Sequence, residues 1–239
     1  YGKAEKTHAK ITRSNDRRRG AGQIIMDLPE LHRLRREDFD AVIRTLTECF
    51  FEDPLYKVLI PERAQRSEIL PEVFDCDANE LVQYCDLYSE SPDVNGLIML
   101  EDPAERKGVR KYLAERYFAY LTEQRLLEDD ESGEIAEHFR KAKDFLSSDW
   151  VGKVGPNTIH IVYFAVRKAF HGKGLAHKLI SPVLAYADKN GVQIALETHN
   201  AANLDMYRHY GFELFDSFSG ELPLREYCLV RKPKGDKEE

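Results

Sequence analysis

The spacing of apolar residues changes along the chain from helical to strand-like and back. Apolar side chains recur at helical spacing over residues 37–50, which predicts a helix that Asp53 and Pro54 end. A less regular helix is predicted over residues 62–81, interrupted at Pro71. Residues 31–34 predict a short strand, and residues 81–88 and 94–100, separated by turn formers, predict a hairpin.

The pattern becomes helical again in the middle of the chain. Over residues 109–121 the apolar residues share one helical face, and a charged second helix is predicted over residues 132–145. We therefore expect a helical insertion at about residues 103–150 that packs on the main domain. The shared face consists of Val109, Tyr112, Leu113, Tyr117, Tyr120 and Leu121.

The last third of the chain alternates between strands and helices. Strands are predicted over residues 158–166 and 192–198, each followed by a helix, and two terminal strands over residues 212–218 and 225–230. The helix after the first strand carries an apolar stripe that can lie on a sheet, and Pro182 should kink it. The predicted fold class is α/β (α+β), a mixed sheet flanked by helices in a single domain over residues 26–239.

Composition and charge narrow the classes of protein. The chain has 239 residues, is 42% apolar and 32% charged, and carries a formal net charge of −7. It contains no apolar run of the ~20 residues that cross a bilayer, so we expect no membrane partner. Residues 1–20 carry seven basic and two acidic side chains, which leaves −12 on the remainder. An acidic body disfavours nucleic acid and favours a cationic partner.

Residues 1–25 differ from the rest of the chain. They are basic, lack apolar periodicity and begin with Tyr1, so we expect a disordered tail or an upstream extension. The four cysteines show no CxxC pair and no regular spacing, which indicates reduced and mostly buried thiols. No spacing of His, Cys, Asp or Glu indicates a metal site, and His160 is expected to be a packing residue.

A glycine-rich loop follows the strand over residues 158–166. Residues 170–176 read FHGKGLA and lead directly into a predicted helix. Glycines there allow a tight turn, and the free amides and positive end of the helix attract an anion such as a diphosphate. A Walker loop does not fit, because Gly174 follows Lys173. A dinucleotide fingerprint fits only in part, because His177 replaces its third glycine.

The next strand and helix carry a second group of polar residues. Asn203 and Tyr207 are four residues apart, and Asn200 precedes Tyr207 by almost two turns, so one helix can present all three to a ligand. Gly211 and Phe212 end this segment.

At these residues the sequence resembles the Gcn5-related N-acetyltransferase family. The acetyl-coenzyme-A loop of that family reads Gln or Arg, two residues, Gly, one residue, Gly or Ala; here His171 stands at the first position. The segment LETHNAANLDMYRHYGF is similar to the family's Asn, Tyr and Gly-Phe ending. The LET run, Asn203, Tyr207, Pro182 and the insertion resemble the puromycin-acetyltransferase-type branch. The specific match covers about residues 159–215.

The resemblance implies a mostly antiparallel sheet that splays beside the predicted strand 158–166, with acetyl-coenzyme A in the opening. It implies catalytic roles for Tyr207 as the acid toward the thiolate, Val166 as the backbone donor to the oxyanion, and Glu197 as the base, with His199 as the alternative base. The implied cofactor-binding residues are Phe164, Ala165, Val166, His171, Gly172, Lys173, Gly174, Leu175, Ala176, Asn200, Asn203 and Tyr207.

The resulting hypothesis is an acetyl-coenzyme-A-dependent N-acetyltransferase that acts on a small-molecule primary amine by direct attack in a ternary complex. We expect a cytoplasmic monomer or homodimer whose acceptor contacts come from residues 50–60 and the insertion, including Tyr56 and Tyr117. A protein or peptide N-terminus is the other acceptor class. A noncatalytic acyl-coenzyme-A sensor and a nicotinamide-dependent oxidoreductase are the alternative functions.

Overall fold

A seven-stranded sheet forms the centre of the computed structural model, which describes residues 26–103, 108–130, 132–143 and 145–235. The strand order is β1-β2-β3-β4-β5-β7-β6, and all neighbours are antiparallel except β4 and β5. The predicted mixed sheet is confirmed. The strands are β1 (His32–Arg33), β2 (Cys85–Ser89), β3 (Gly96–Glu101), β4 (Thr158–Val166), β5 (Gln193–Thr198), β6 (Glu213–Ser219) and β7 (Arg225–Arg231).

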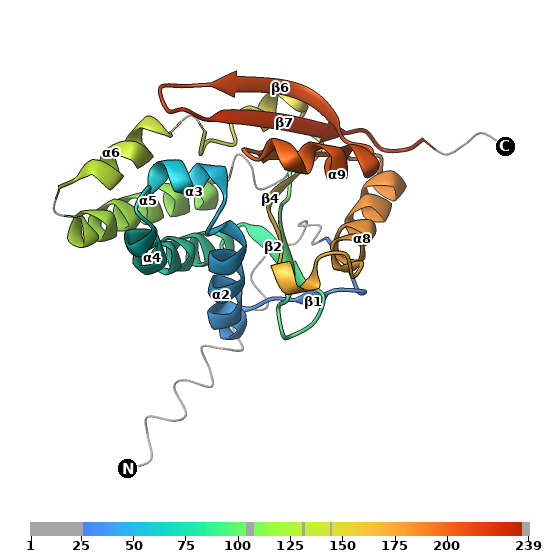
Figure 1. The fold of residues 1–239 in the computed structure, drawn as a ribbon. Coiled ribbons are helices and arrows are strands. Elements are labelled where there is room, and N and C mark those ends of the chain that lie inside the picture. Colours follow the sequence, from blue (N-terminus) through green and yellow to red (C-terminus); the bar gives the residue numbers. More distant parts are fainter. Residues whose placement is uncertain (1–25, 104–107, 131, 144, 236–239) are drawn as a thin grey trace, which may run out of the picture.

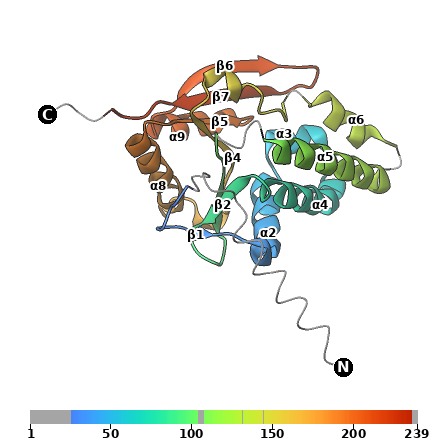
Figure 2. The ribbon, with the colours of Figure 1, turned by 180° about the vertical axis from the view of Figure 1, so that it is seen from behind.

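Helices flank the sheet on two sides. Figure 1 shows α2 to α6 gathered on one side of β4 and α8 on the other, and the reverse view in Figure 2 agrees. The helices are α2 (Phe39–Phe50), α3 (Pro54–Leu59), α4 (Arg63–Leu81), α5 (Val109–Asp129), α6 (Glu134–Lys141), α7 (Val151–Val154), α8 (Leu175–Asn190) and α9 (Leu204–His209). Short 3-10 turns are η2 (Arg36–Asp38), η3 (Lys168–Phe170) and η4 (Ala201–Asn203).

The two sides of the sheet have separate hydrophobic cores. Phe74 of α4 and Leu97 of β3 belong to the core under α2 to α5, whereas Ile98 of β3 and Leu179 of α8 belong to the other. Neighbouring residues of β3 thus enter opposite cores, because successive strand side chains point to opposite faces. The sheet therefore holds both layers of helices in fixed positions relative to β4.

One local prediction for the first hundred residues was wrong, and a second was confirmed but incomplete. Pro71 does not interrupt α4, which runs through it. Proline removes one helical hydrogen bond, and the burial of Ile69, Leu70 and Phe74 around it outweighs that loss. Asp53 and Pro54 end α2 as expected, but they also start α3, with Asp53 accepting the amide of Leu55 and proline at the first helical position.

The insertion packs on the domain with a different face from the apolar one. Val109 is 73% exposed, and Tyr112, Leu113, Tyr117 and Tyr120 also face solvent. The opposite face of α5 carries Lys111, Ala114 and Leu126, all buried. Lys111 forms an ion pair with Glu101 of β3, which draws that face of the helix inward. Apolar periodicity alone could not show this, because the buried face contains a charge.

Three other expectations concern the whole chain. The tail over residues 1–25 lies outside the described residues. Among the helices that the structure describes, none is both long and apolar enough to cross a membrane. All four cysteines are free, and Cys76, Cys85 and Cys228 are buried, as predicted.

Gly96 lies where β3 meets α8. A Cβ atom there would come within 2.8 Å of Leu179 Cδ1 and 3.1 Å of the Ala165 carbonyl oxygen. We expect Gly96→Ala to lower the free energy of unfolding by about 1–3 kcal/mol through overpacking, as measured by urea denaturation. Gly152→Ala is the control, because a Cβ there meets no described atom within 4 Å. Equal stabilities of the two variants would contradict this packing.

Candidate active site

The strands β4 and β5 separate partway along their length. They pair from Thr158 with Gln193 to Ile161 with Leu196. Beyond that point β4 continues to pair with β3, and β5 with β7. Within the described chain, the β5-facing edge of β4 over residues 162–166 therefore has no strand beside it. We call this opening the gap. It corresponds to the separation of strands that the family resemblance implies.

Two backbone amides of β4 point into the gap. The Arg167 amide donates to the Asn95 carbonyl at 2.9 Å, so these two residues form a hydrogen-bonded pair of the antiparallel ladder. Because such pairs alternate with non-bonded pairs, the N–H and C=O groups of Val166 and Phe164 point away from β3. The same alternation directs the backbone groups of Ala165 to β3, so the structure does not place Ala165 as a backbone ligand in the gap.

The glycine loop lies at the open end of the gap. Gly172 and Gly174 have φ of 72° and 78°, in the left-handed region that favours glycine, and a Cβ on either would meet no described atom within 4 Å. The first amides of α8 have no intrahelical partner, and Gly174 supplies no side-chain cap. An open turn with free amides at the start of a long helix fits the diphosphate of coenzyme A, which residues 172–176 would hold.

His171 joins the loop to the strand. Its Nε2 lies 2.8 Å from the Val166 carbonyl oxygen and donates to it, because a carbonyl can only accept. This bond occupies the Val166 carbonyl and leaves the Val166 amide for a ligand. At the position where the acetyltransferase family carries Gln or Arg, His171 thus links the glycine loop to β4 through a hydrogen bond. Lys173 and Lys178, both exposed, add positive charge at this end.

The two asparagines of the predicted ligand-facing set support the turn instead. Asn200 Oδ1 accepts the Ala202 amide at 3.1 Å, and Asn203 Nδ2 donates to Thr198 Oγ1 at 3.4 Å. These bonds fix the path of the chain from β5 into α9. Asn200 is the N-cap of η4 and Asn203 ends η4, so one helix does not carry all three residues as expected; their contact with a ligand stays a prediction.

Tyr207 is the buried member of that set. It is 6% exposed and packs edge-to-face on Phe212, with ring centroids 5.9 Å apart. Burial raises its pKa well above the ordinary value, and the charges of Glu197 and Asp53 raise it further. The phenol therefore stays protonated at neutral pH and lies near two carboxylates.

Glu197 belongs to a buried chain of charges that crosses the sheet. Its Oε2 accepts from His160 Nε2 at 2.8 Å and from Trp150 Nε1 at 3.2 Å. His160 Nδ1 lies 3.6 Å from Glu101, which binds Lys111 at 2.5 Å. Burial alone would lower the pKa of His160, but the charge of Glu197, the hydrogen bond to Glu197 and the nearby charge of Glu101 raise it to about 9.

His160 is therefore not the packing residue that we expected. It is a charged link between Glu101 and Glu197. Sequence spacing could not predict this contact, because the three residues come from three different strands and meet only through the sheet register. An isolated histidine in an apolar strand is the one signal that could have prompted the search.

A second polar group lies near the vertex of the gap, where β4 and β5 separate. His199 Nε2 lies 3.3 Å from Glu226 Oε2, and burial raises the pKa of Glu226. Burial also raises the pKa of Asp53 at the start of α3, while its Leu55 hydrogen bond and the charge of His199 oppose the rise. The α2–α3 turn thus reaches the same end of β5 as Glu197, in agreement with the expected acceptor side over residues 50–60.

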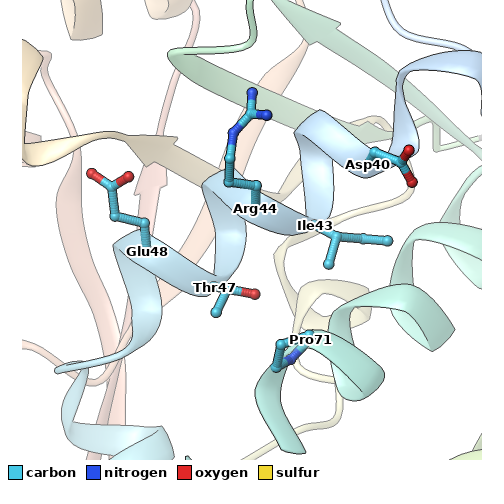
Figure 3. A pocket seen from close by; sticks show the side chains of 6 residues that line it. All are labelled: Asp40, Ile43, Arg44, Thr47, Glu48 and Pro71. Carbon is cyan, nitrogen blue, oxygen red and sulfur yellow. The ribbon is translucent and has the colours of Figure 1, made fainter. Parts of the chain in front are cut away.

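A surface hollow of about 400 Å³ lies elsewhere. It is lined by Asp40, Ile43, Arg44, Thr47 and Glu48 of α2 and by Pro71 of α4 (Figure 3). None of these residues is a predicted site residue, and the hollow lies on the far side of α2 from β4. Among the described residues, no group of three or more His, Cys, Asp or Glu side chains is arranged to hold a metal ion.

Comparisons with known proteins agree with this geometry. The structure of a protein described as histone acetyltransferase HPA2 and related acetyltransferase, from Corynebacterium glutamicum, superposes with a TM-score of 0.57 over 87% of this chain and 98% of that one, at 17% identity. An uncharacterised N-acetyltransferase of Schizosaccharomyces pombe is 21% identical over 219 residues, which cover 84% of this chain and 83% of that protein.

A shorter stretch of 77 residues is 32% identical to a probable serine/threonine-protein kinase of Dictyostelium discoideum. This stretch is 31% of the chain and spans only 10% of that protein. Kinase activity therefore does not transfer to this chain.

The fold and the gap define an acetyltransferase class. Residues 100–212, slightly less than half of the chain, match the model of the acetyltransferase (GNAT) family. Members of that family use acetyl-coenzyme A as the acetyl donor, so the matched segment indicates an acetyltransferase domain. The narrower resemblance to the puromycin-acetyltransferase-type branch stays a prediction.

The charge on His160 makes stability depend on pH. Its pKa in the fold, about 9, lies above the ordinary 6.5, so its stabilising contribution is complete below pH 6.5 and is lost as the pH rises through 9. We expect His160→Gln to lower the free energy of unfolding by roughly 3 kcal/mol at pH 6.5 and by less at pH 9. Urea denaturation at both values tests this, with exposed His209→Gln as the control. A loss that does not change with pH would show that His160 is neutral.

Proposed function

We propose that this enzyme transfers the acetyl group of acetyl-coenzyme A to the primary amine of a small molecule, by direct attack while both substrates are bound. The observation that carries the proposal is the unpaired edge of β4, which lies between an anion-binding loop and a buried phenol. One end of the gap suits a diphosphate, and the other brings a proton donor near carboxylates.

The backbone of β4 would hold and polarise the thioester. When bound, acetyl-coenzyme A supplies an acetyl group joined to sulfur. An amide that faces the gap donates to the thioester oxygen, where negative charge develops during attack. The resemblance to the acetyltransferase family implies that the Val166 amide is this donor. The Phe164 amide faces the same way and lies nearer to the vertex and Glu197.

Glu197 and Tyr207 would move the two protons of the reaction. The attacking nitrogen must lose a proton, and Glu197 is the proposed acceptor, directly or through water. Its Oε2 holds His160 and Trp150, which leaves Oε1 for this task. The nitrogen–carbon bond forms as the carbon–sulfur bond breaks, and the Tyr207 hydroxyl gives its proton to the departing sulfur.

The arrangement of the insertion favours a small acceptor. Helix α6 lies against α3, with His138 Nδ1 donating to the Leu59 carbonyl at 3.1 Å. Figure 1 shows α5 and α6 beside α3 and α4, so the acceptor side is covered. An open groove for a peptide would need this side uncovered. Tyr56 lies on this side, but Tyr117 projects outward from α5, so the structure does not support the expected contact of Tyr117 with the acceptor.

Tyr207→Phe tests the proposed acid. We expect kcat for coenzyme A release with an amine panel to fall by roughly 10²-fold or more, while acetyl-coenzyme A affinity is unchanged. The matched control is Tyr210→Phe, which alters a half-buried tyrosine one turn further along the chain. An unchanged kcat in Tyr207→Phe would remove Tyr207 from the mechanism. Binding of acetyl-coenzyme A with no turnover of any amine would favour a sensor.

Gly174→Ala tests the loop. Alanine at φ 78° strains the turn by about 1–2 kcal/mol, so we expect roughly tenfold weaker coenzyme A binding by calorimetry. Gly191→Ala places the same strain (φ 63°) at the other end of α8 and should leave binding unchanged. Equal effects of the two variants would place the diphosphate elsewhere.

A further inference from the structure

On the face of β4 that meets α2 to α4, a tyrosine, an aspartate and a second tyrosine are hydrogen-bonded in a row. The Tyr163 hydroxyl donates to Asp77 Oδ2 at 2.5 Å, and the Tyr56 hydroxyl lies 3.2 Å from the Tyr163 hydroxyl. Asp77 comes from α4, Tyr163 from β4 and Tyr56 from α3. The mechanism above uses none of the three.

Aromatic rings surround this row. Phe50 and Phe74 pack with Tyr56 and Tyr163 at centroid distances between 5.2 and 6.0 Å. Phe74 and Tyr56 are buried, whereas Phe50, Tyr163 and Asp77 are only half-buried. The cluster is therefore not fully closed off from solvent at these three residues.

Asp77 has no basic partner. Among the ion pairs of the described residues, none involves Asp77, and the like charge of Glu80 contributes to raising its pKa. Burial raises its pKa to about 7, although the Tyr163 hydrogen bond opposes the rise. A carboxylate in such surroundings is costly when ionised unless a cation accompanies it, and aromatic faces bind organic cations.

The cluster lies next to the proposed reaction site. Tyr163 directly precedes Phe164, whose amide faces the gap, and adjacent strand residues send their side chains to opposite faces. The charge of Asp53 acts on both Tyr56 and Tyr207, so the α2–α3 turn joins the cluster to the phenol. The cluster therefore lies on the same side of the gap as the α2–α3 turn.

We propose that Asp77, Tyr163 and Phe50 bind a cationic group of the acceptor other than the nitrogen that is acetylated, so the substrate class is a small amine with a second positive charge. This inference rests on the proposed function for the position of the acceptor. The nitrogen at Asp77 is not the nucleophile, because a carboxylate partner favours the charged form and attack needs a neutral amine. The net charge of −12 outside residues 1–20 attracts such a substrate.

A cation that cannot be acetylated tests the site apart from catalysis. We expect butyltrimethylammonium to bind the coenzyme-A-loaded protein in calorimetry, and Asp77→Asn to weaken it roughly tenfold or more. Asp75→Asn is the control, because Asp75 lies on the same helix but pairs with Arg125. No binding to the native protein, or equal binding to Asp77→Asn, would overturn the proposal.

Kinetics supply the second measurement. We expect 1,4-diaminobutane to have a lower KM than butylamine, and Asp77→Asn to abolish that difference by raising the KM of the diamine with little change in kcat. A preference that survives Asp77→Asn would overturn the inference and leave the proposed function standing. Cation binding without acetylation of any amine would overturn the proposed function and leave the cation site standing. If Asp77→Asn does not fold, Phe50→Leu replaces it as the test variant. We expect Phe50→Leu to bind the cation about threefold more weakly, and unchanged binding would overturn the proposal.

Discussion

The separation of β4 from β5 is the constraint on which the site depends. These two strands form the one parallel pair in the described sheet, and their pairing stops at Ile161 and Leu196. Both strands continue, because β3 and β7 supply partners on their outer edges. The amides of Phe164 and Val166 thus have no strand partner among the described residues, without any loss of strand structure. A ligand that completes this edge gains hydrogen bonds that the fold has left open.

The side chains around the opening are arranged by charge. Lys111, Glu101, His160 and Glu197 alternate in sign across three strands and the insertion, so each buried charge has a partner of opposite sign. Asp77, on the same side of the sheet, has no such partner among the ion pairs of the described residues. A buried charge is stable when it has a partner of opposite charge. The four residues of the network supply such partners to one another, whereas Asp77 would receive one only from a bound cation.

The sequence allowed the prediction of features that depend on neighbours along the chain. The glycine turn, the strand before it and helix α8 follow from local spacing and are present in the structure, whereas the site role of Tyr207 stays a prediction. Contacts across strands could not be predicted in this way. His160 meets Glu197 and Tyr163 meets Asp77 only after the sheet and α4 have assembled. The exposed face of α5 was misjudged for a related reason, because the buried Lys111 has its partner on β3.

The ion pair between Lys111 and Glu101 also has an evolutionary consequence. Helix α5 supplies the ion-pair partner of Glu101, so removal of α5 would leave Glu101 beside His160 without its lysine. A descendant that shortened this segment would have to replace Glu101, and with it the support of His160, in the same lineage. We therefore expect the length of the insertion and the identity of these two strand residues to change together among related chains.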